Sequence, residues 1–370
     1  MTAGSAVGGD KFATDKAALG EKLYFDANLS KNRTQSCATC HNPDYGFVDN
    51  RETAVGKAVS LGDDGKSLGD RNAPSAAYAR FSPDFHQNKQ GKYIGGQFLD
   101  GREKDLAGQA GGPPLNPIEM GMPDKASVVA RLQENAAYVQ TFKQLFGDTV
   151  FDKPETAYAA LTESIAEFEK TDRFAPFDSK YDRYLKGEVE LTDQESLGES
   201  LFFSNQFTNC NRCHQLKTFP GSEGETFSNY EYHNLGVPTN KAVREANGKG
   251  VDFIDNGLLG QEGIKDDKEA GKFKVPTLRN VEVTGPYMHN GVFHDLKTVV
   301  LFYDKFNNSG RKLNPETSQP WEVPEVARNL ALEEKDFQAP ALKDKEVDAL
   351  VAFLRTLTDR RYEPLLENRK

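Results

Sequence analysis

Two five-residue stretches decide how this chain folds: Cys37-Ala38-Thr39-Cys40-His41 and Cys210-Asn211-Arg212-Cys213-His214. Both have the pattern C-x-x-C-H, in which two thiols can bond to the two vinyl groups of a haem. The histidine after each pair is then placed to bind the iron. The sequence therefore predicts two covalent c-type haems, attached at Cys37, Cys40, Cys210 and Cys213, with His41 and His214 as iron ligands.

Other roles for the four cysteines explain the pattern less well. A four-cysteine zinc site needs no histidine after either pair. A thioredoxin-like site needs a βαβ setting, and a disulfide framework gives no reason for the same histidine twice. Because the two motifs use every cysteine of the chain, haem attachment is the interpretation that leaves none over.

Composition limits the partners and the location. The 370 residues carry a formal net charge of −10 without a run of basic residues, which disfavours nucleic acid as a partner. No apolar run is long enough for a transmembrane segment. Residues 1–10, MTAGSAVGGD, lack the features of a signal peptide. Because c-type haems are attached after export, we expect a periplasmic or otherwise exported protein whose signal peptide is not present in this chain.

An internal repeat surrounds the two motifs. Leu19-Gly20-Glu21-Lys22-Leu23-Tyr24-Phe25 precedes the first motif, and Leu197-Gly198-Glu199-Ser200-Leu201-Phe202-Phe203 precedes the second. Apolar residues at helical spacing recur near 159–168 and near 347–354. A repeat of half the chain indicates a duplicated domain. We predict a mostly α fold with long loops, made of two cytochrome-c-like domains, residues 10–175 and 176–370, each with one covalent haem.

Beyond these motifs, the chain resembles the bacterial dihaem cytochrome c peroxidases and their MauG-type relatives. The matching stretches are Arg71-Asn72-Ala73-Pro74-Ser75, Asp100-Gly101-Arg102, Leu115-Asn116-Pro117-Ile118-Glu119-Met120-Gly121-Met122, Phe273-Lys274-Val275-Pro276-Thr277-Leu278-Arg279-Asn280 and Pro286-Tyr287-Met288-His289-Asn290-Gly291. The resemblance implies a high-spin, peroxide-reactive haem in the N-terminal domain and a low-spin electron-relay haem in the C-terminal one.

The loop after Asp100-Gly101-Arg102 bears on the first haem. The resemblance implies that a histidine of this loop closes the iron in many members, whereas here residues 109–114 read Gln-Ala-Gly-Gly-Pro-Pro. Pro113 has no ligating side-chain atom, as in the MauG-type branch, so we expect an open iron site. Glu119 matches the distal carboxylate that moves a proton during cleavage of peroxide, and Gln109 is expected to hydrogen-bond the peroxide.

Two residues compete for the sixth position of the second iron. A methionine ligand, Met288, would give a haem of high potential. The resemblance instead places the ligand at Tyr303, where MauG-type proteins have tyrosine. An anionic tyrosinate favours ferric iron, so the haem would store an oxidising equivalent better than it would accept electrons from a small cytochrome.

The resemblance also implies a calcium ion between the domains. Asn72, Thr284 and Pro286 match its ligands, and oxygen-only coordination is usual for calcium. Arg102 and Arg279 are expected to pair with haem propionates.

One part of the family pattern is missing. Leu99 replaces the tryptophan that family members place between the haems, and Phe207-Thr208 stand where MauG has a surface tryptophan. The sole tryptophan, Trp321, lies far off in a proline-rich loop. Phe98, Tyr93 or direct transfer between the haems would have to replace the missing relay. We assign no chemistry to the other histidines, His86, His233, His289 and His294.

Three functions follow from these residues. The leading hypothesis is an enzyme in which hydrogen peroxide forms high-valent haem, which oxidises a tryptophan or tyrosine of a partner protein. A cytochrome c peroxidase that reduces peroxide to water with electrons from a small redox protein is the second. A non-catalytic dihaem electron carrier or redox sensor is the third, and the sequence leaves monomer and homodimer both open.

Overall fold

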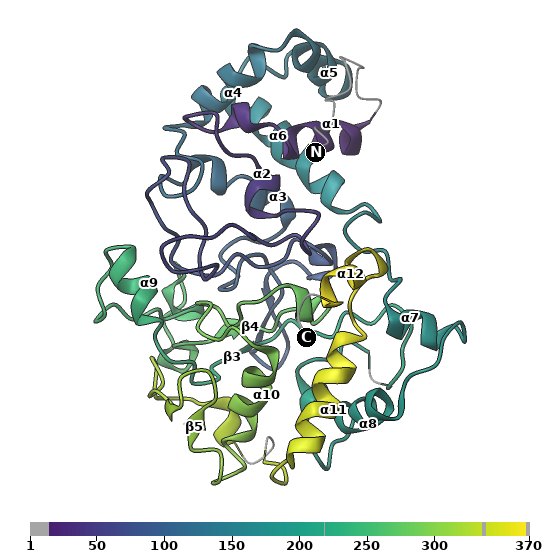
Figure 1. Ribbon diagram of the computed structural model, residues 1–370. Helices are drawn as coiled ribbons and strands as arrows, with labels where there is room; N and C mark the ends of the chain where they lie inside the picture. The colour runs from purple at the N-terminus through teal and green to yellow at the C-terminus, as the bar shows by residue number, and fades with distance from the viewer. Residues whose placement is uncertain (1–14, 218, 335–337, 368–370) are drawn as a thin grey trace.

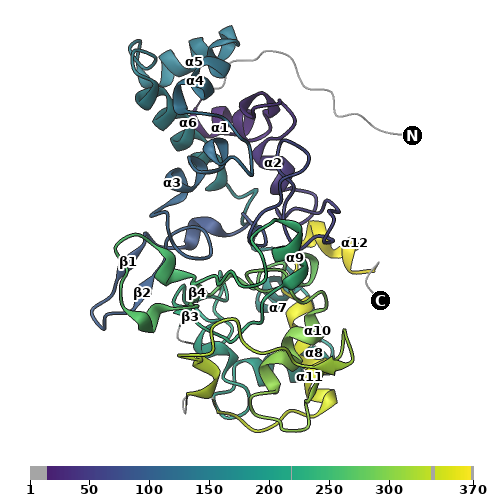
Figure 2. The same ribbon diagram turned by 90° about the vertical axis from the view of Figure 1, so that its left-hand side faces the viewer.

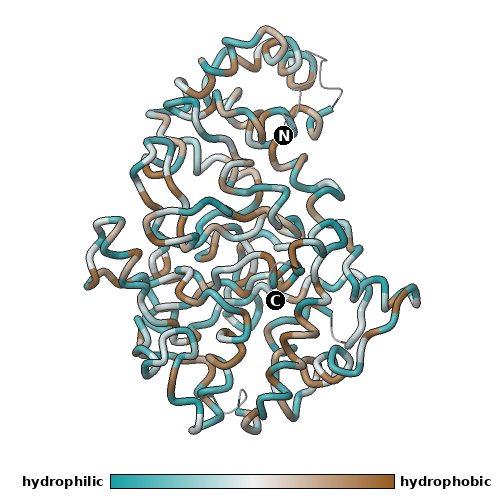
Figure 3. The backbone as a smooth tube through the Cα atoms, in the orientation of Figure 1, coloured by the Kyte–Doolittle hydropathy of each residue, from teal (hydrophilic) through white to brown (hydrophobic). Residues whose placement is uncertain are grey.

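Two lobes, one above the other in Figure 1, make up the computed structural model, which describes residues 15–217, 219–334 and 338–367. Buried side chains form one hydrophobic core within residues 19–175 and another within residues 181–357. Figure 3 shows hydrophobic residues in both lobes rather than in one. Residues 10–14 and 368–370, at the outer ends of the two predicted domains, lie outside the described residues.

Helices dominate the first lobe, as predicted. Its helices are α1 (Lys16–Tyr24), α2 (Cys37–Cys40), α3 (Leu106–Ala110), α4 (Lys125–Gln133), α5 (Ala136–Phe146) and α6 (Pro154–Glu169). A short hairpin of β1 (His86–Gln87) and β2 (Tyr93–Ile94) extends from it toward the second lobe in Figure 2. There Ile94 forms an antiparallel bridge with Glu231. The hairpin therefore links the lobes through the backbone.

The second lobe is helical too, with long loops. Its helices are α7 (Lys180–Leu185), α8 (Asp193–Phe202), α9 (Lys241–Ala246), α10 (Leu296–Asp304), α11 (Asp344–Arg355) and α12 (Glu363–Leu366). Two antiparallel pairs of strands join β3 (Tyr232–His233) to β4 (Phe273–Lys274) and β5 (Leu313–Asn314) to β6 (Gln319–Pro320). Among the described residues of the whole chain, no helix is long and apolar enough to span a bilayer.

The internal repeat appears as two matched helix pairs. α1 packs against α6 in the first lobe, and α8 packs against α11 in the second. A Cβ atom on Gly20 would lie 1.8 Å from the carbonyl oxygen of Ser164, and one on Gly198 would lie 1.9 Å from that of Ala349. Both distances are far below a van der Waals contact, so glycine at these two matched positions lets each helix pair approach closely.

The segment before α12 returns to the first lobe, as its yellow ribbon shows in Figure 1. Asp359 is fully buried, accepts a hydrogen bond from the Tyr78 hydroxyl at 2.6 Å and accepts another from Asn280 Nδ2 at 2.8 Å. The Tyr362 hydroxyl donates to the carbonyl oxygen of Pro43 at 2.7 Å. Residues of the second half of the chain thus hold the loop that follows His41.

Candidate functional site

The first C-x-x-C-H stretch begins with α2. Ser36 and Thr39 form a capping box that starts this single turn, which puts Cys37 and Cys40 on one face. Both thiols are free, and burial raises the pKa of each to about 12. His41 Nδ1 lies 3.2 Å from the carbonyl oxygen of Phe47 and donates to it, because a carbonyl can only accept. Its Nε2 therefore carries the lone pair that an iron requires.

The second stretch repeats this arrangement. A 3₁₀ turn, Cys210–Arg212, carries the first thiol, and His214 Nδ1 lies 3.1 Å from the carbonyl oxygen of Phe227. Phe47 and Phe227 have nearly equal left-handed φ angles of 57° and 56°. Burial lowers the pKa of His214 to about 4, so its imidazole is neutral at pH 7. The hydrogen bond that orients a metal-binding histidine is therefore present in both lobes.

A cavity of about 380 Å³ lies at the second stretch and extends between the lobes. Cys210, Cys213 and His214 line it, and apolar side chains form most of its wall. Free thiols one turn apart, a neutral imidazole with a free Nε2 and an apolar enclosure are what a covalent haem requires. The residues of this site fit a haem, and the first stretch offers the same thiols and imidazole.

The three predicted peroxide-site residues lie in the last turn of α3 and in the loop that follows it. Gln109 lies in the last turn of α3. Its carbonyl oxygen accepts a hydrogen bond from Gly112 N at 3.0 Å. Pro113 begins the next 3₁₀ turn, and its carbonyl oxygen accepts from Asn116 N at 3.2 Å. Glu119 N in turn donates to the carbonyl oxygen of Asn116 at 3.0 Å. These backbone bonds hold Gln109, Pro113 and Glu119 in one compact loop.

Glu119 has the environment of a proton carrier. Burial raises the pKa of its carboxyl group, and the charge of Arg102 and a hydrogen bond from Asn116 oppose that rise. Asn116 Nδ2 donates to Glu119 Oε1 at 2.9 Å, which fixes the carboxyl group. The charge of Glu119 also raises the pKa of the Cys40 thiol, so the carboxyl group lies close to the first attachment site.

Both candidate ligands for the second iron line the cavity that contains His214. Tyr303 comes from α10, and burial raises the pKa of its hydroxyl well above the usual value. Met288 lies in a loop, has a φ angle of 67° and lines the same cavity. The structure brings both to the same cavity and does not choose between them.

The three predicted calcium ligands also line this cavity. Asn72 Nδ2 donates to the carbonyl oxygen of Ala58 at 3.1 Å, and no hydrogen bond to Asn72 Oδ1 occurs among the described residues, so this oxygen could bind a cation. Thr284 and Pro286 lie in the loop that follows the 3₁₀ turn Val281–Val283. Within the described ranges, no cluster of three or more His, Cys, Asp or Glu residues could hold a metal, so any calcium here would depend on neutral oxygens.

The two arginines predicted to bind propionates differ in their free donors. Arg279 is buried, and its five N–H groups are directed to Asp182, Ser179 and the carbonyl oxygen of Glu225. No donor of Arg279 is left for a propionate. Arg102 bonds to Asp100 at 2.9 Å and stacks over the Phe98 ring at 3.6 Å, with part of its guanidinium exposed.

The aromatic residues considered as relays occupy different places. Leu99 and Phe98 line the cavity, and Tyr93 stacks on Phe85 with ring centroids 5.5 Å apart. Trp321, predicted to lie far from the position of Leu99, is not among the residues that line this cavity. Its ring centroid is 5.7 Å from that of Phe302, the residue before Tyr303, because a loop folds back onto α10.

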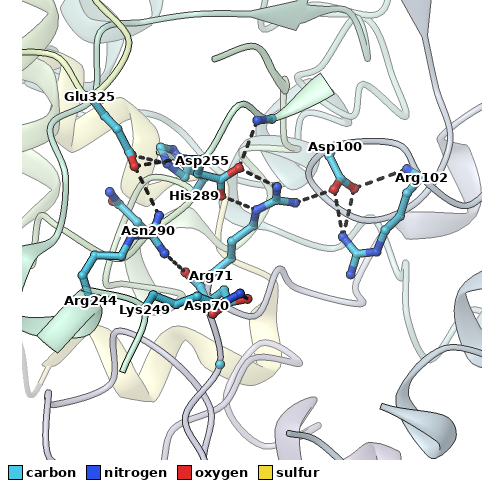
Figure 4. A network of polar contacts seen from close by, with 12 residues as sticks. Asp70, Arg71, Asp100, Arg102, Arg244, Lys249, Asp255, His289, Asn290 and Glu325 are labelled. Carbon is cyan, nitrogen blue, oxygen red and sulfur yellow. Dashed lines mark hydrogen bonds and ion pairs between the residues drawn. The ribbon is translucent and has the colours of Figure 1, made fainter. Parts of the chain in front are cut away.

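A buried network of ion pairs joins the two lobes (Figure 4). Arg71 donates through Nε and Nη2 to Asp255, both at 2.7 Å, and through Nη1 to Asp100 at 2.7 Å. Burial alone would raise the pKa of Asp255, but the bonds and charge of Arg71 outweigh it and hold that pKa well below its usual range. This pair could not be predicted from the sequence, because Arg71 and Asp255 are 184 residues apart.

Comparison with known proteins shows the family of this chain. A family model described as di-haem cytochrome c peroxidase matches residues 14–190. The methylamine utilization protein MauG of Paracoccus denitrificans is 55% identical over 353 residues, covering 95% of this chain and 90% of that protein. The cytochrome c551 peroxidase of Nitrosomonas europaea is 30% identical over 341 residues, covering 90% of this chain and 85% of that protein.

The crystal structure of a related protein shows a similar fold. The diheme peroxidase BthA from Burkholderia thailandensis superposes with a TM-score of 0.82 at 33% sequence identity, covering 94% of this chain and 86% of that one. Fold and site together define a dihaem peroxidase-type oxidoreductase. The chain belongs to the dihaem cytochrome c peroxidase/MauG family, and its high identity to a MauG confirms the predicted branch.

Proposed function

We propose that this protein uses hydrogen peroxide to oxidise a tryptophan or tyrosine residue of a partner protein. It would do so with two covalent c-type haems, one in each of two cytochrome-c-like domains, residues 10–175 and 176–370. Haem attachment in turn places the protein in the periplasm or another exported compartment. The identity of 55% to a methylamine utilization protein MauG supports this choice.

The loop of residues 109–114 carries the proposal. When bound at Cys37, Cys40 and His41, a haem would supply an iron that reacts with peroxide and takes up its oxidising equivalents. Pro113 would leave that iron open to peroxide, because proline has no ligating side-chain atom. A site that stays open without prior reduction is what a peroxide-activated enzyme requires.

Glu119 would move the proton that cleavage of peroxide needs. Because burial raises its pKa, a larger share of its carboxyl groups holds a proton near neutral pH than for an exposed glutamate. The carboxylate form takes the proton from one peroxide oxygen and gives it to the other, and the raised pKa makes it a stronger base for the first of these steps, while Asn116 holds Oε1 in place. Gln109 would orient the peroxide by a hydrogen bond.

The second haem would be held by His214 and closed by Tyr303. The Phe227 carbonyl orients His214, and Tyr303 lines the same cavity as His214. A calcium ion held by Asn72, Thr284 and Pro286 would fix the junction of the lobes, since these residues come from both halves of the chain.

One titration tests the function. The ferric protein should show one high-spin and one low-spin haem by EPR, and one equivalent of peroxide should change both haem spectra for minutes. In Glu119→Gln the change should be at least tenfold slower, whereas Glu103→Gln, a matched control on the neighbouring loop, should react like wild type. A resting protein in which neither iron binds cyanide or peroxide would refute the proposal.

A peroxidase that draws electrons from a small redox protein is the second candidate, since Leu99 and Thr208 replace the two tryptophans of the MauG pattern. Rapid turnover with reduced cytochrome c would favour it. A slow reaction with cytochrome c and a long-lived oxidised state would favour oxidation of a partner residue.

A further inference from the structure

One lysine at the junction of the lobes has a charge without a counterion. Lys274, on β4, lines the cavity beside the second attachment site. Its Nζ donates to two neutral acceptors of the first lobe, the carbonyl oxygen of Gly96 and Ser82 Oγ. An ammonium group has three donors, so one remains. No carboxylate among the described residues forms an ion pair with it, and Asp100, the acidic group whose charge it senses, is bonded to Arg71 and Arg102.

The other charged side chains of the cavity wall are all neutralised. Each of the remaining arginine, aspartate and glutamate side chains that line it has a partner of opposite charge: Asp255 with Arg71, Arg279 with Asp182, Asp304 with Arg311 and Glu325 with Arg244. Lys274 is the exception. Burying a charge without a partner is costly, and burial accordingly lowers the pKa of Lys274 to about 7. An anion in the cavity would remove that cost.

A second polar side chain of the cavity wall comes from a residue whose backbone bonds to Gly95. Tyr230 is buried and lines the cavity, and its hydroxyl lies beside that of Thr226 without forming a hydrogen bond of regular geometry among the described residues. The carbonyl oxygen of Tyr230 accepts from Gly95 N at 3.0 Å, next to the Gly96 that binds Lys274. An ammonium and a hydroxyl, both short of an acceptor, are the donors that a carboxylate binds.

We propose that Lys274 and Tyr230 form a carboxylate-binding site, and that its ligand is a propionate of the haem attached at Cys210 and Cys213. The inference rests on haem attachment in the proposed function. That haem is chosen because Cys210, Cys213 and His214 line this cavity, whereas Cys37, Cys40 and His41 do not. Arg279, the obvious cation from the sequence, has no donor left.

Lys274→Met tests the site by spectroscopy. Loss of the ammonium leaves a propionate uncompensated, which favours ferric over ferrous iron. At a fixed solution potential the ferrous-to-ferric ratio of the second haem should fall about tenfold. This corresponds to a fall of about 59 mV in the reduction potential of that haem. The propionate bending band of that haem in the resonance Raman spectrum should shift. Tyr230→Phe should shift the band without changing the charge, and Lys274→Arg should restore the ratio.

Lys272→Met is the matched control. Lys272 lies two residues away on the same segment and pairs with Glu269 at 3.0 Å, outside the cavity lining. This variant should leave the band and the ratio unchanged. An unchanged band in both Lys274→Met and Tyr230→Phe, or a shift confined to the first haem, overturns the assignment. A mass spectrum of wild type without two haems would instead refute the proposed function and this inference with it.

Discussion

Replacing Arg71 with methionine should strongly destabilise the protein, because it breaks the buried network between the lobes. The change removes three hydrogen bonds of 2.7 Å, two to Asp255 and one to Asp100. The side chains involved are only 20%, 7% and 10% exposed for Arg71, Asp255 and Asp100. Methionine keeps much of the side-chain volume, so the change mainly removes charge and donors.

The expected cost follows from burial. Removing one partner of a buried ion pair typically costs about 3–5 kcal/mol, because the remaining charge stays buried without a partner. Arg33 offers a matched control, since it bonds to Glu134 through two contacts of 2.8 and 2.9 Å with both side chains 48% exposed. Arg33→Met should cost less than about 1 kcal/mol, because exposed pairs contribute little.

The pH dependence supplies a second signature. Arg71 holds the pKa of Asp255 below its unfolded value in the folded state, so this stabilisation is fully present above about pH 4 and is lost as pH falls. The difference in the free energy of unfolding between wild type and Arg71→Met should therefore be largest near pH 7 and should become smaller below pH 4. Urea unfolding followed by far-UV circular dichroism at both pH values measures it. Equal losses in Arg71→Met and Arg33→Met at pH 7 would refute the reasoning.

Three further changes have defined outcomes. Gly20→Ala and Gly198→Ala should each lower the free energy of unfolding by about 1–3 kcal/mol, since overpacking outweighs the better helix propensity of alanine. Burial raises the pKa of Glu169 to about 8, so wild type should lose stability as pH rises from about 4.3 to 8. Glu169→Gln should lack that loss in urea unfolding. Tyr303→Phe should open the second iron, so that cyanide binds both haems in absorption spectra.

Each of these outcomes has a clear opposite. Alanine variants as stable as wild type would mean that the helix pairs separate at no cost. A pH profile of Glu169→Gln that follows wild type would place the titration elsewhere. If cyanide still binds one haem in Tyr303→Phe, Met288 becomes the better candidate for the sixth ligand, and Met288→Leu should then open the iron instead.

Features that depend on neighbouring residues in the chain could be predicted from the sequence. Attachment needs two thiols and a histidine within five residues, so C-x-x-C-H predicts it directly. The lack of a histidine in residues 109–114 is equally visible. The amphipathic helices near 159–168 and 347–354 could be predicted from apolar spacing, and the mostly helical fold is confirmed.

Features that depend on distant pairings could not be predicted. Arg279 looked available for a propionate until the structure showed Asp182 and the Glu225 carbonyl taking its donors. Lys274 lies in the stretch from Phe273 to Asn280 that carries the family resemblance. Only the fold shows that its charge has no partner among the described residues. The contact between Trp321 and Phe302, whose ring centroids are 5.7 Å apart, is another pairing of residues distant in the sequence.

The return of the Asp359–Tyr362 segment to the first lobe constrains how the protein matures. The Pro43 carbonyl receives its hydrogen bond from a tyrosine 319 positions later in the chain. Until that tyrosine is in place, the loop beside His41 lacks this hydrogen bond. The N-terminal lobe therefore completes this part of its structure only together with the C-terminal end of the chain.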